Sequence, residues 1–469
     1  MKVEQLYTGC LAEAAYYIES DGEVAIIDPL REVEPYIQKA EENGAKIKYV
    51  LETHFHADFV SGHLDLAKKT GAKIVFGPTA QPGFDAHVAT DGEILQLGRV
   101  KIKVLHTPGH TMESSTFLLI NEEGEETAIF TGDTLFIGDV GRPDLAVKTD
   151  LTREDLAGYL FDSLRNKIMT LPDDVIVYPG HGAGSACGKN MSKETTDTLG
   201  NQKQFNYALR ADMTRDEFIG EVTKGLVAPP QYFPKNAVMN KQGYESIDEV
   251  LHRGVIALEL NEFEDVVARN NALILDTRPK EDFVKGFIPG SLWIGIDDNF
   301  APWVGALIQD LNQTIVFLAL PGREEEVVTR LSRVGYDHAV GFLDGGIASW
   351  IGGGKEVQTV TEIGPHDFTN IYDTEVVDVL DVRKQSEFES QHIKGAVNFP
   401  LDFIYDNLDQ LDKDTEYYVH CQGGYRSVIA TSILMAKGFK EVINIQGGFN
   451  EIKKSCIKVT EYHEPETML

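Results

Sequence analysis

Cysteine and long apolar runs are both scarce in this chain. Its 469 residues include only four cysteines, at positions 10, 187, 421 and 456, which are too few and too far apart to cross-link a chain of this length. Such scarcity is typical of a reducing compartment. No run of about 18 apolar residues predicts a membrane-spanning helix, and the N-terminus lacks the basic and apolar segments of a secretory signal. We therefore expect a cytoplasmic protein that does not enter a membrane.

Positive charge is also in deficit. The chain has 43 Lys and Arg against 74 Asp and Glu, a formal net charge of −31. A field of this sign repels phosphate backbones and anionic lipid, so we expect neither nucleic acid nor a membrane surface as a partner. The length predicts roughly three domains of about 150 residues. As a separate expectation, the protein is a homo-oligomer.

Residues 1–200 alternate apolar strands with helices. Val100–His106, for example, alternates with the period of two that is typical of a half-buried strand. Several strands end in turns that carry Asp or His, the positions where α/β proteins place their chemistry. Residues 201–258 differ, with a helical stretch predicted at Gln202–Phe218 and a proline-rich break at 228–234. We interpret this segment as a helical extension or linker.

The last two hundred residues contain an internal duplication. Asp276-Thr-Arg278 matches Asp381-Val-Arg383, and Leu343-Asp-Gly-Gly346 matches Ile445-Gln-Gly-Gly448 in the same order. Collinear matches of this kind predict two related α/β domains, which we place at residues 259–357 and 365–465.

Candidate metal ligands lie in the loops that follow successive strands of the first domain. The first pair is His-x-His, and side chains two apart on an extended strand point to the same side. Imidazole and carboxylate are the ligands that a borderline divalent metal prefers. Residue types alone do not separate iron from zinc, because His56 as a third imidazole would complete a hydrolytic zinc site. The candidates in chain order are His54, His56, Asp58, His110, Asp133 and His181.

The order His-x-His-x-Asp, Pro-Gly-His, Thr-Gly-Asp, Pro-Gly-His resembles the metallo-β-lactamase superfamily across about residues 1–200. This resemblance implies an N-terminal αββα sandwich. The binuclear hydrolases of that superfamily, such as glyoxalase II, carry a His directly after the Asp of the first motif. This chain has Phe59 there, and Phe cannot bind a metal. We therefore expect a mononuclear centre.

Within the superfamily the chain is most similar to the persulfide dioxygenases. That resemblance implies one Fe(II) per chain, held by His54, His110 and Asp133. Two His and one carboxylate make the facial triad of non-heme iron oxygenases, which leaves positions for dioxygen and substrate.

Other residues of the first domain receive supporting roles. We expect His56, Asp58 and His181 to support the ligands through hydrogen bonds or to act as extra ligands. The resemblance makes Arg142 a candidate to hold an anionic part of the substrate, with a structural ion pair to Asp144 as an equal alternative. Cys187, in a Gly-rich loop after His181, is either a sulfur relay or a passive thiol.

A second reactive group is predicted near the C-terminal end. Cys421 follows an apolar strand and precedes a Gly-Gly turn, after which Arg426 opens a helix. Backbone N–H groups, the helix N-terminus and the Arg426 charge would stabilise a thiolate or a persulfide anion. With Asp381-Val-Arg383, the Cys-x4-Arg-Ser loop resembles the rhodanese family, which implies two rhodanese-like three-layer α/β domains and a persulfide on Cys421. The first copy has no Cys, so we expect it to pack or to shape a pocket.

Together these resemblances imply a persulfide dioxygenase with a sulfurtransferase attached, acting in sulfide detoxification. The iron domain would oxidise a low-molecular-weight persulfide, such as that of glutathione or coenzyme A, with O2 to sulfite. The Cys421 domain would move a sulfane sulfur and form thiosulfate. Two alternatives stay open: a zinc-dependent thioester hydrolase of the glyoxalase II type with an attached sulfurtransferase, and a persulfide sensor or sulfur carrier with a vestigial metal centre.

Overall fold

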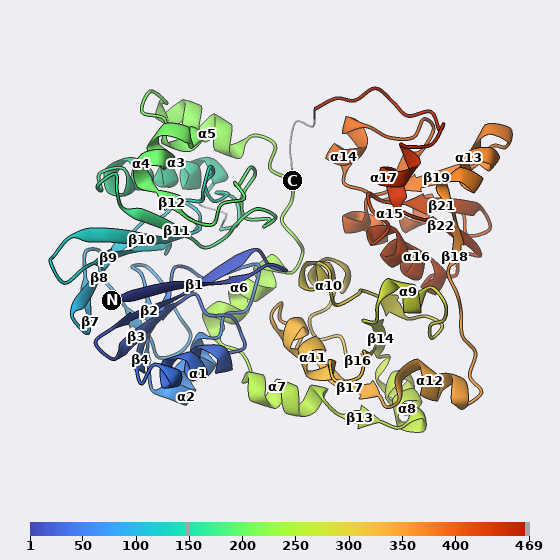
Figure 1. Ribbon diagram of the computed structural model, residues 1–469, viewed down its shortest axis with the longest axis horizontal. Helices are drawn as coiled ribbons and strands as arrows, with labels where there is room; N and C mark the ends of the chain where they lie inside the picture. The colour runs from blue at the N-terminus through green and yellow to red at the C-terminus, as the bar shows by residue number, and fades with distance from the viewer. Residues whose placement is uncertain (147–150, 465–469) are drawn as a thin grey trace. The chain divides into compact units, whose positions relative to one another are not determined.

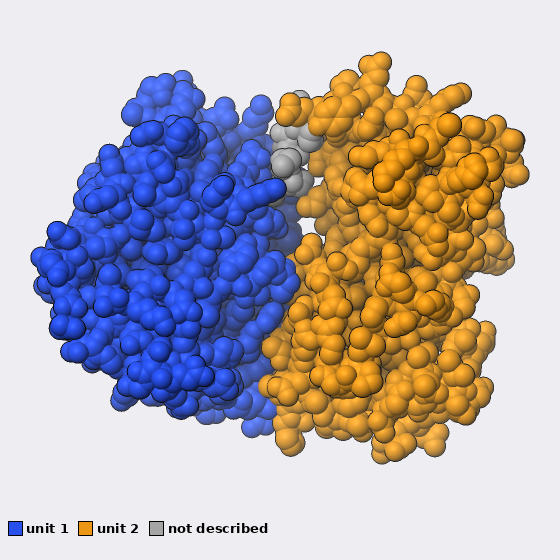
Figure 2. Space-filling model, viewed as in Figure 1, with its two compact units in different colours: residues 1–249, 332–335, 469 blue, residues 250–331, 336–468 orange. Residues whose placement is uncertain are grey.

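The computed structural model describes residues 1–146 and 151–464, and backbone contacts divide them into two compact units (Figure 2). The first unit comprises residues 1–249 and 332–335, and the second comprises residues 250–331 and 336–464. Within the described residues, no helix is both long and apolar enough to cross a bilayer. The finer domain limits proposed from the sequence remain predictions.

The first unit is built on two six-stranded sheets (Figure 1). The first sheet has the strand order β1-β2-β3-β4-β5-β6, and the second has the order β12-β11-β10-β9-β8-β7. The strands of the first sheet are β1 (Lys2–Thr8), β2 (Glu13–Ser20), β3 (Glu23–Ile27), β4 (Lys46–Glu52), β5 (Lys73–Phe76) and β6 (His87–Val88). Those of the second are β7 (Ile94–Leu97), β8 (Val100–His106), β9 (Ser115–Ile120), β10 (Glu126–Gly132), β11 (Ile176–Pro179) and β12 (Asp197–Thr198).

Three apolar cores define four layers in this unit. The central core joins the inner faces of the two sheets, where Tyr16 and Ile27 pack with Val104 and Phe130. A second core lies between the first sheet and helices α1 (Glu34–Glu42) and α2 (His63–Thr70). A third covers the outer face of the second sheet with helix α3 (Arg153–Ser163). This arrangement confirms the expected αββα sandwich.

The segment after residue 200 belongs to the third core as far as Val222 instead of standing apart. Leu209 and Phe218 are buried against the outer side of the second sheet. The continuous helix predicted at Gln202–Phe218 is wrong, because α4 ends at Phe205 and α5 begins at Arg215. Asn206 breaks the helix: its backbone is extended, and its side chain accepts from the Ala208 N–H. The helices of this segment are α4 (Leu199–Phe205), α5 (Arg215–Thr223), α6 (Phe233–Gln242) and α7 (Ile247–Gly254).

The second unit contains two five-stranded sheets with the same strand pattern. Their orders are β13-β17-β16-β14-β15 and β18-β22-β21-β19-β20, so each strand of one has its counterpart five places later. The strands are β13 (Ala257–Leu258), β14 (Leu273–Asp276), β15 (Leu292–Trp293), β16 (Ile315–Leu318), β17 (Ala339–Leu343), β18 (Thr361–Ile363), β19 (Asp378–Asp381), β20 (Val397–Asn398), β21 (Glu416–His420) and β22 (Glu441–Ile445). The shared order confirms the predicted duplication.

Both sheets are parallel and have helices around them. Every residue of the central strand β16 is buried, as expected when helices cover both faces of a parallel sheet. The helices of the first copy are α8 (Leu260–Asn270), α9 (Lys280–Phe283), α10 (Phe300–Leu307), α11 (Glu324–Ser332) and α12 (Gly346–Gly352). Those of the second are α13 (Pro365–Thr374), α14 (Gln385–Ser390), α15 (Ile404–Asn407), α16 (Arg426–Ala436) and α17 (Gly448–Ile452). These layers confirm the predicted α/β fold class.

Candidate functional site

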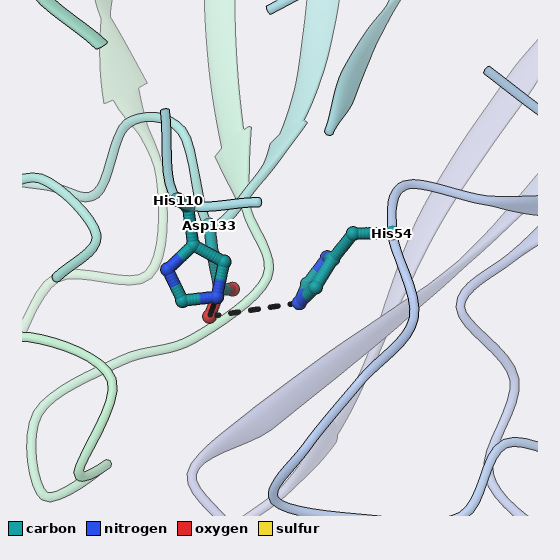
Figure 3. A group of neighbouring side chains, drawn as sticks. All are labelled: His54, His110 and Asp133. Carbon is teal, nitrogen blue, oxygen red and sulfur yellow. Dashed lines mark ion pairs between the residues drawn. The ribbon is translucent and has the colours of Figure 1, made fainter. Parts of the chain in front are cut away.

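His54, His110 and Asp133 meet in the first unit, although they come from three separate strand ends (Figure 3). His54 follows β4, His110 follows β8 and Asp133 follows β10. Asp133 Oδ2 lies 3.4 Å from His110 Nε2 and 4.0 Å from His54 Nε2. All three side chains are buried, and one potential ligand atom from each lies within 4.8 Å of the others.

Hydrogen bonds behind the imidazoles set which nitrogen faces this centre. The Thr53 hydroxyl donates its one proton to Asp28 Oδ2 at 2.7 Å, so toward His54 Nδ1, 3.0 Å away, it can only accept. His110 Nδ1 likewise donates to the Arg142 carbonyl at 2.9 Å. In the neutral form, both rings therefore present an unprotonated Nε2, the form that binds a metal. Burial and the neighbouring imidazoles also lower the pKa of His54 well below its usual value, which keeps the ring neutral.

A second group lies on the other side of the same aspartate. His181 Nε2 is 3.6 Å from Asp133 Oδ1 and 3.2 Å from Asp58 Oδ2, and Cys187 is the third member of the group. The His181 ring is held by its Nδ1, which donates to the Ala12 carbonyl at 3.1 Å. Asp133 thus presents one oxygen to each group.

The buried polar atoms of the two groups fit a cation. Both Asp133 oxygens, one Asp58 oxygen and His181 Nε2 are buried without a hydrogen-bond partner among the described residues. Buried carboxylate oxygens normally find a donor. Oxygen and imidazole atoms that converge and lack donors are the ligand set of a divalent metal.

His56 does not join the His54 group. Its Nε2 lies 3.1 Å from Asp28 Oδ1 and 3.4 Å from Glu52 Oε2. Burial alone would lower the pKa of His56, but the charges and hydrogen bonds of Asp28 and Glu52 raise it well above its usual value. A protonated His56 cannot bind a metal. The geometry thus favours a supporting role, in which His56 fixes Asp28 and Asp28 fixes Thr53 behind His54.

Sequence reasoning missed most of this supporting network. Burial raises the pKa of Glu52, but His56 and His63 outweigh it and bring that pKa down to about 2. His63 Nδ1 lies 3.4 Å from Glu52 Oε1. Asp28, directly after β3, was the one residue of this network that the sequence pointed to. A carboxylate that ends an apolar strand is poorly explained by packing.

The Arg142 guanidinium is held by Asp144 in its own loop and by carbonyls of two other segments. Its guanidinium donates to both Asp144 oxygens at 2.7 and 2.8 Å, and also to the carbonyls of Ala186 at 3.3 Å and Val227 at 2.5 Å. This geometry favours the structural ion pair that the sequence left as an alternative. Contact with a substrate would require this pair to open. Through its carbonyl, Arg142 still orients His110.

Cys187 lies beside the candidate metal centre. Its thiol is buried with Asp58 and His181, and its carbonyl accepts from the Arg142 N–H at 3.0 Å. Burial, followed by the charges of Asp58 and Asp133, raises the pKa of this thiol well above its usual value. Without a cation nearby, Cys187 is therefore a neutral thiol, which is a poor nucleophile for sulfur transfer.

In the second unit, Cys421 lies at the carboxyl end of β21, in the turn before α16. The Gly424 N–H donates to the Cys421 sulfur at 3.0 Å, as the Gly-rich turn predicts. Gly424 has φ +95°, a backbone region that a side chain would strain. The Phe449 N–H donates to the Cys421 carbonyl at 2.7 Å and holds the other side of the loop.

The loop's arginines are paired with carboxylates. Arg426 donates to both Glu387 oxygens at 2.6 and 2.8 Å. Burial lowers the pKa of Arg426, but Glu387 and then Cys421 raise it above its usual value overall. Arg383 binds Asp381 through two nitrogens and donates to Gln422 at 3.0 Å, which fixes the start of the loop. The Asp-x-Arg motif therefore has a structural role.

Comparisons with known proteins agree with this division. A family model described as the metallo-β-lactamase superfamily matches residues 8–181, and one described as a rhodanese-like domain matches residues 259–352 and 364–455. A probable hydroxyacylglutathione hydrolase of Schizosaccharomyces pombe is 30% identical, over 44% of this chain and 85% of the relative. The human mitochondrial persulfide dioxygenase ETHE1 is 33% identical, over 37% of this chain and 65% of the relative.

A solved structure extends the likeness. The crystal structure of a metallo-beta-lactamase from Staphylococcus aureus subsp. aureus COL is 32% identical, with a TM-score of 0.63 over 73% of this chain and 98% of that one. The chain belongs to the metallo-β-lactamase superfamily and carries two rhodanese-like domains behind its metallo-β-lactamase domain.

Proposed function

We propose that this chain is an Fe(II)-dependent persulfide dioxygenase coupled to a sulfurtransferase. One observation carries the first half: two imidazoles and a carboxylate converge, while Phe59 occupies the place where binuclear relatives have a metal-binding His. Phe59 is buried, with its ring centroid 4.3 Å from that of His56. The likeness to a persulfide dioxygenase supports the same activity.

The protein's own groups would divide the work as follows. His54, His110 and Asp133 would hold Fe(II), which when bound supplies the capacity to activate dioxygen. Thr53 and the Arg142 carbonyl keep the two rings in the metal-binding tautomer. Burial of the centre excludes bulk water, which protects a reactive persulfide from hydrolysis.

The second half of the proposal assigns sulfur transfer to Cys421. The Gly424 N–H and the nearby Arg426 charge stabilise negative charge on its sulfur. The Cys421 domain would pass sulfane sulfur to the sulfite made in the first unit and form thiosulfate. The proposal includes glutathione or coenzyme A persulfide as substrate, a homo-oligomer, and a cytoplasmic location, which suits four unpaired cysteines.

A zinc-dependent thioester hydrolase is the second candidate function. It is favoured by the hydroxyacylglutathione hydrolases among the relatives and by the Asp58, His181 and Cys187 group on the far side of Asp133. A second metal there, which Asp58 and His181 would hold, would make the centre binuclear. Metal content and substrate separate the two functions.

The deciding experiment loads metal-free protein with Fe(II) or with Zn(II). Oxygen uptake is measured with glutathione persulfide and coenzyme A persulfide, and hydrolysis with a hydroxyacylglutathione thioester. We expect persulfide-dependent oxygen uptake with one iron per chain, lost in His110→Ala and retained in the exposed control His338→Ala. Thioester turnover with two zinc ions per chain, and no oxygen uptake with either persulfide, would refute the dioxygenase.

The division of labour has its own test. Cys421→Ser should abolish thiosulfate formation and leave sulfite release in place, because the two sites use different residues. The surface variant Cys456→Ser is the matched control, since Cys456 is exposed. Loss of sulfite together with thiosulfate in Cys421→Ser would show that the iron site receives its substrate through Cys421.

A further inference from the structure

The Cys-less rhodanese copy reaches the Cys421 loop of the other copy within the second unit. The Tyr425 hydroxyl, one residue before α16, donates to the Gly295 carbonyl at 3.0 Å. The rings of Tyr425 and Trp293 meet edge to face, with centroids 5.1 Å apart. The backbone N–H of Trp293 donates to the Ser432 hydroxyl on α16 at 3.1 Å. Residues of the first copy thus fix the position of the loop that carries the nucleophile.

The same copy brings a cation to the rim of that loop. A Cβ built on Gly424 would lie 3.8 Å from the Lys280 ammonium nitrogen. Gly424 is also the residue whose N–H donates to the Cys421 sulfur. Lys280 opens α9 in the Cys-less copy, and about a third of its side chain is exposed. The Lys280 ammonium and the Cys421 sulfur therefore both approach Gly424, although they come from different copies.

Lys280 is held less tightly by carboxylates than Arg426 and Arg383, the two arginines beside the Cys421 loop. Arg426 is held by both oxygens of Glu387, and Arg383 is held by Asp381. Among the described residues, the one ion pair that Lys280 makes within 4 Å is with Glu281, and it is long at 3.9 Å. An ammonium with a distant partner at a partly exposed rim can exchange that partner for a ligand at little cost.

We propose that the Cys-less copy forms the second wall of the sulfur-transfer site, where Lys280 binds the anionic oxygens of a small oxyanion acceptor of the sulfite class. The inference rests on the proposed sulfurtransferase function and names the residue that binds its acceptor. In the step, the sulfite sulfur attacks the outer sulfur of the Cys421 persulfide. A new S–S bond forms, the old S–S bond breaks, and its electron pair leaves on the Cys421 thiolate. Charge is conserved, and no further reductant or oxidant is needed.

An acidic residue of the same copy lies within electrostatic range of Lys280 and gives the inference a second test, with the opposite expected result. The Lys280 charge acts on the Asp298 carboxylate, and the Asp298 charge acts on the Tyr425 hydroxyl. Burial and Asp297 raise the pKa of Asp298, and Lys280 lowers it. An anionic Asp298 would compete with sulfite for Lys280. Removing its charge should therefore favour the acceptor.

The test is a single-turnover reaction of full-length protein whose Cys421 has first been loaded with sulfane sulfur. The loaded protein is mixed with sulfite, an anion, or with cyanide, which near neutral pH is mostly the uncharged acid. Loss of one ammonium–anion contact near the surface should slow transfer to sulfite on the order of five- to tenfold in Lys280→Met. Transfer to cyanide should fall much less, and Lys280→Arg should restore the sulfite rate. Asp298→Asn should raise the sulfite rate.

The matched control is Lys355→Met, which removes the same charge from the same copy. Lys355 pairs with Glu264 on α8 and follows α12, and both helices lie at the end of the copy away from α16 (Figure 1). Equal sulfite rates in wild type, Lys280→Met and Lys355→Met would overturn the role of Lys280. Equal losses with sulfite and cyanide would also overturn it, because they would mean a general effect on the loop. No transfer to sulfite in the wild type would instead refute the proposed sulfurtransferase function itself.

Discussion

Replacing Thr53 by Val tests whether hydrogen bonds behind the imidazoles control metal binding. Valine matches threonine in shape and lacks the hydroxyl that accepts from His54 Nδ1 at 3.0 Å and donates to Asp28 at 2.7 Å. Without that acceptor, His54 can place its proton on Nε2, the nitrogen that faces Asp133. Loss of such a supporting contact typically weakens metal binding about 10–100-fold.

The stability change follows from linkage. Metal at about 1,000 times the wild-type Kd stabilises the folded unit by about 4.1 kcal/mol. A 100-fold weaker site at the same metal concentration is at about ten times its Kd, where the stabilisation is about 1.4 kcal/mol. Thr53→Val should therefore lose about 2.7 kcal/mol of metal-dependent stability. The metal-free variant also loses about 1–3 kcal/mol, because a buried Asp28 oxygen loses its donor.

Competition with a chromophoric chelator measures Kd, and thermal unfolding with and without metal measures the stabilisation. Thr53→Ser keeps the hydroxyl and should bind metal as the wild type does. Thr127→Val is the matched control, because Thr127 lies near the other end of β10 from Asp133 and its hydroxyl donates to the Leu119 carbonyl. Unchanged Kd in Thr53→Val, with the fold intact by circular dichroism, would refute the tautomer argument.

Further predictions concern the second metal, the ligand loop and the Cys421 domain. Phe59→His should raise bound zinc from one toward two per chain, measured by elemental analysis; two zinc ions in the wild type would contradict the mononuclear centre expected from Phe59. Gly141→Ala should weaken metal binding, because its Cβ would lie 1.9 Å from the backbone carbonyl oxygen of Asp133, a proposed metal ligand. Gly220→Ala has open space around the new Cβ and should leave the metal Kd unchanged. Burial raises the pKa of Glu387, but its arginine partner lowers it below the usual value overall. The ion pair contributes fully to stability at pH values above the Glu pKa in the unfolded chain, about 4.3. This contribution is lost as the pH falls through the lower pKa of Glu387 in the folded protein. Urea unfolding between pH 7 and pH 3 should therefore show a smaller loss of stability on acidification in Glu387→Gln than in the wild type; equal losses would contradict the assignment.

The sequence predicted the strands and the loops that carry the chemistry because these features are local. Period-two alternation marked β8 with its observed limits, Val100–His106. A Gly-rich turn after an apolar strand predicted that a backbone N–H would meet the Cys421 sulfur, and Gly424 supplies it. The duplication was visible because both copies keep similar short motifs in the same order and at nearly the same spacing.

The helical extension shows where local patterns mislead. Gln202–Phe218 contains enough helix-forming residues to predict one helix, but Asn206 caps a short turn, and Leu209 and Phe218 are buried on the second sheet. Tertiary packing overrides helix propensity when the free energy gained by burying apolar side chains exceeds the small free-energy differences in helix propensity.

By itself, the sequence determined the α/β class, the repeat, and which residue types could bind a metal or carry sulfur. The tertiary structure decided which of them meet: His56 turns toward Asp28 and Glu52, Arg142 pairs with Asp144, and Lys280 approaches a loop in the other copy. Periodicity and turn residues record how a segment folds with its own neighbours. The partner of a buried side chain depends on which strand ends come together across the sheets, and no local pattern encodes that distance.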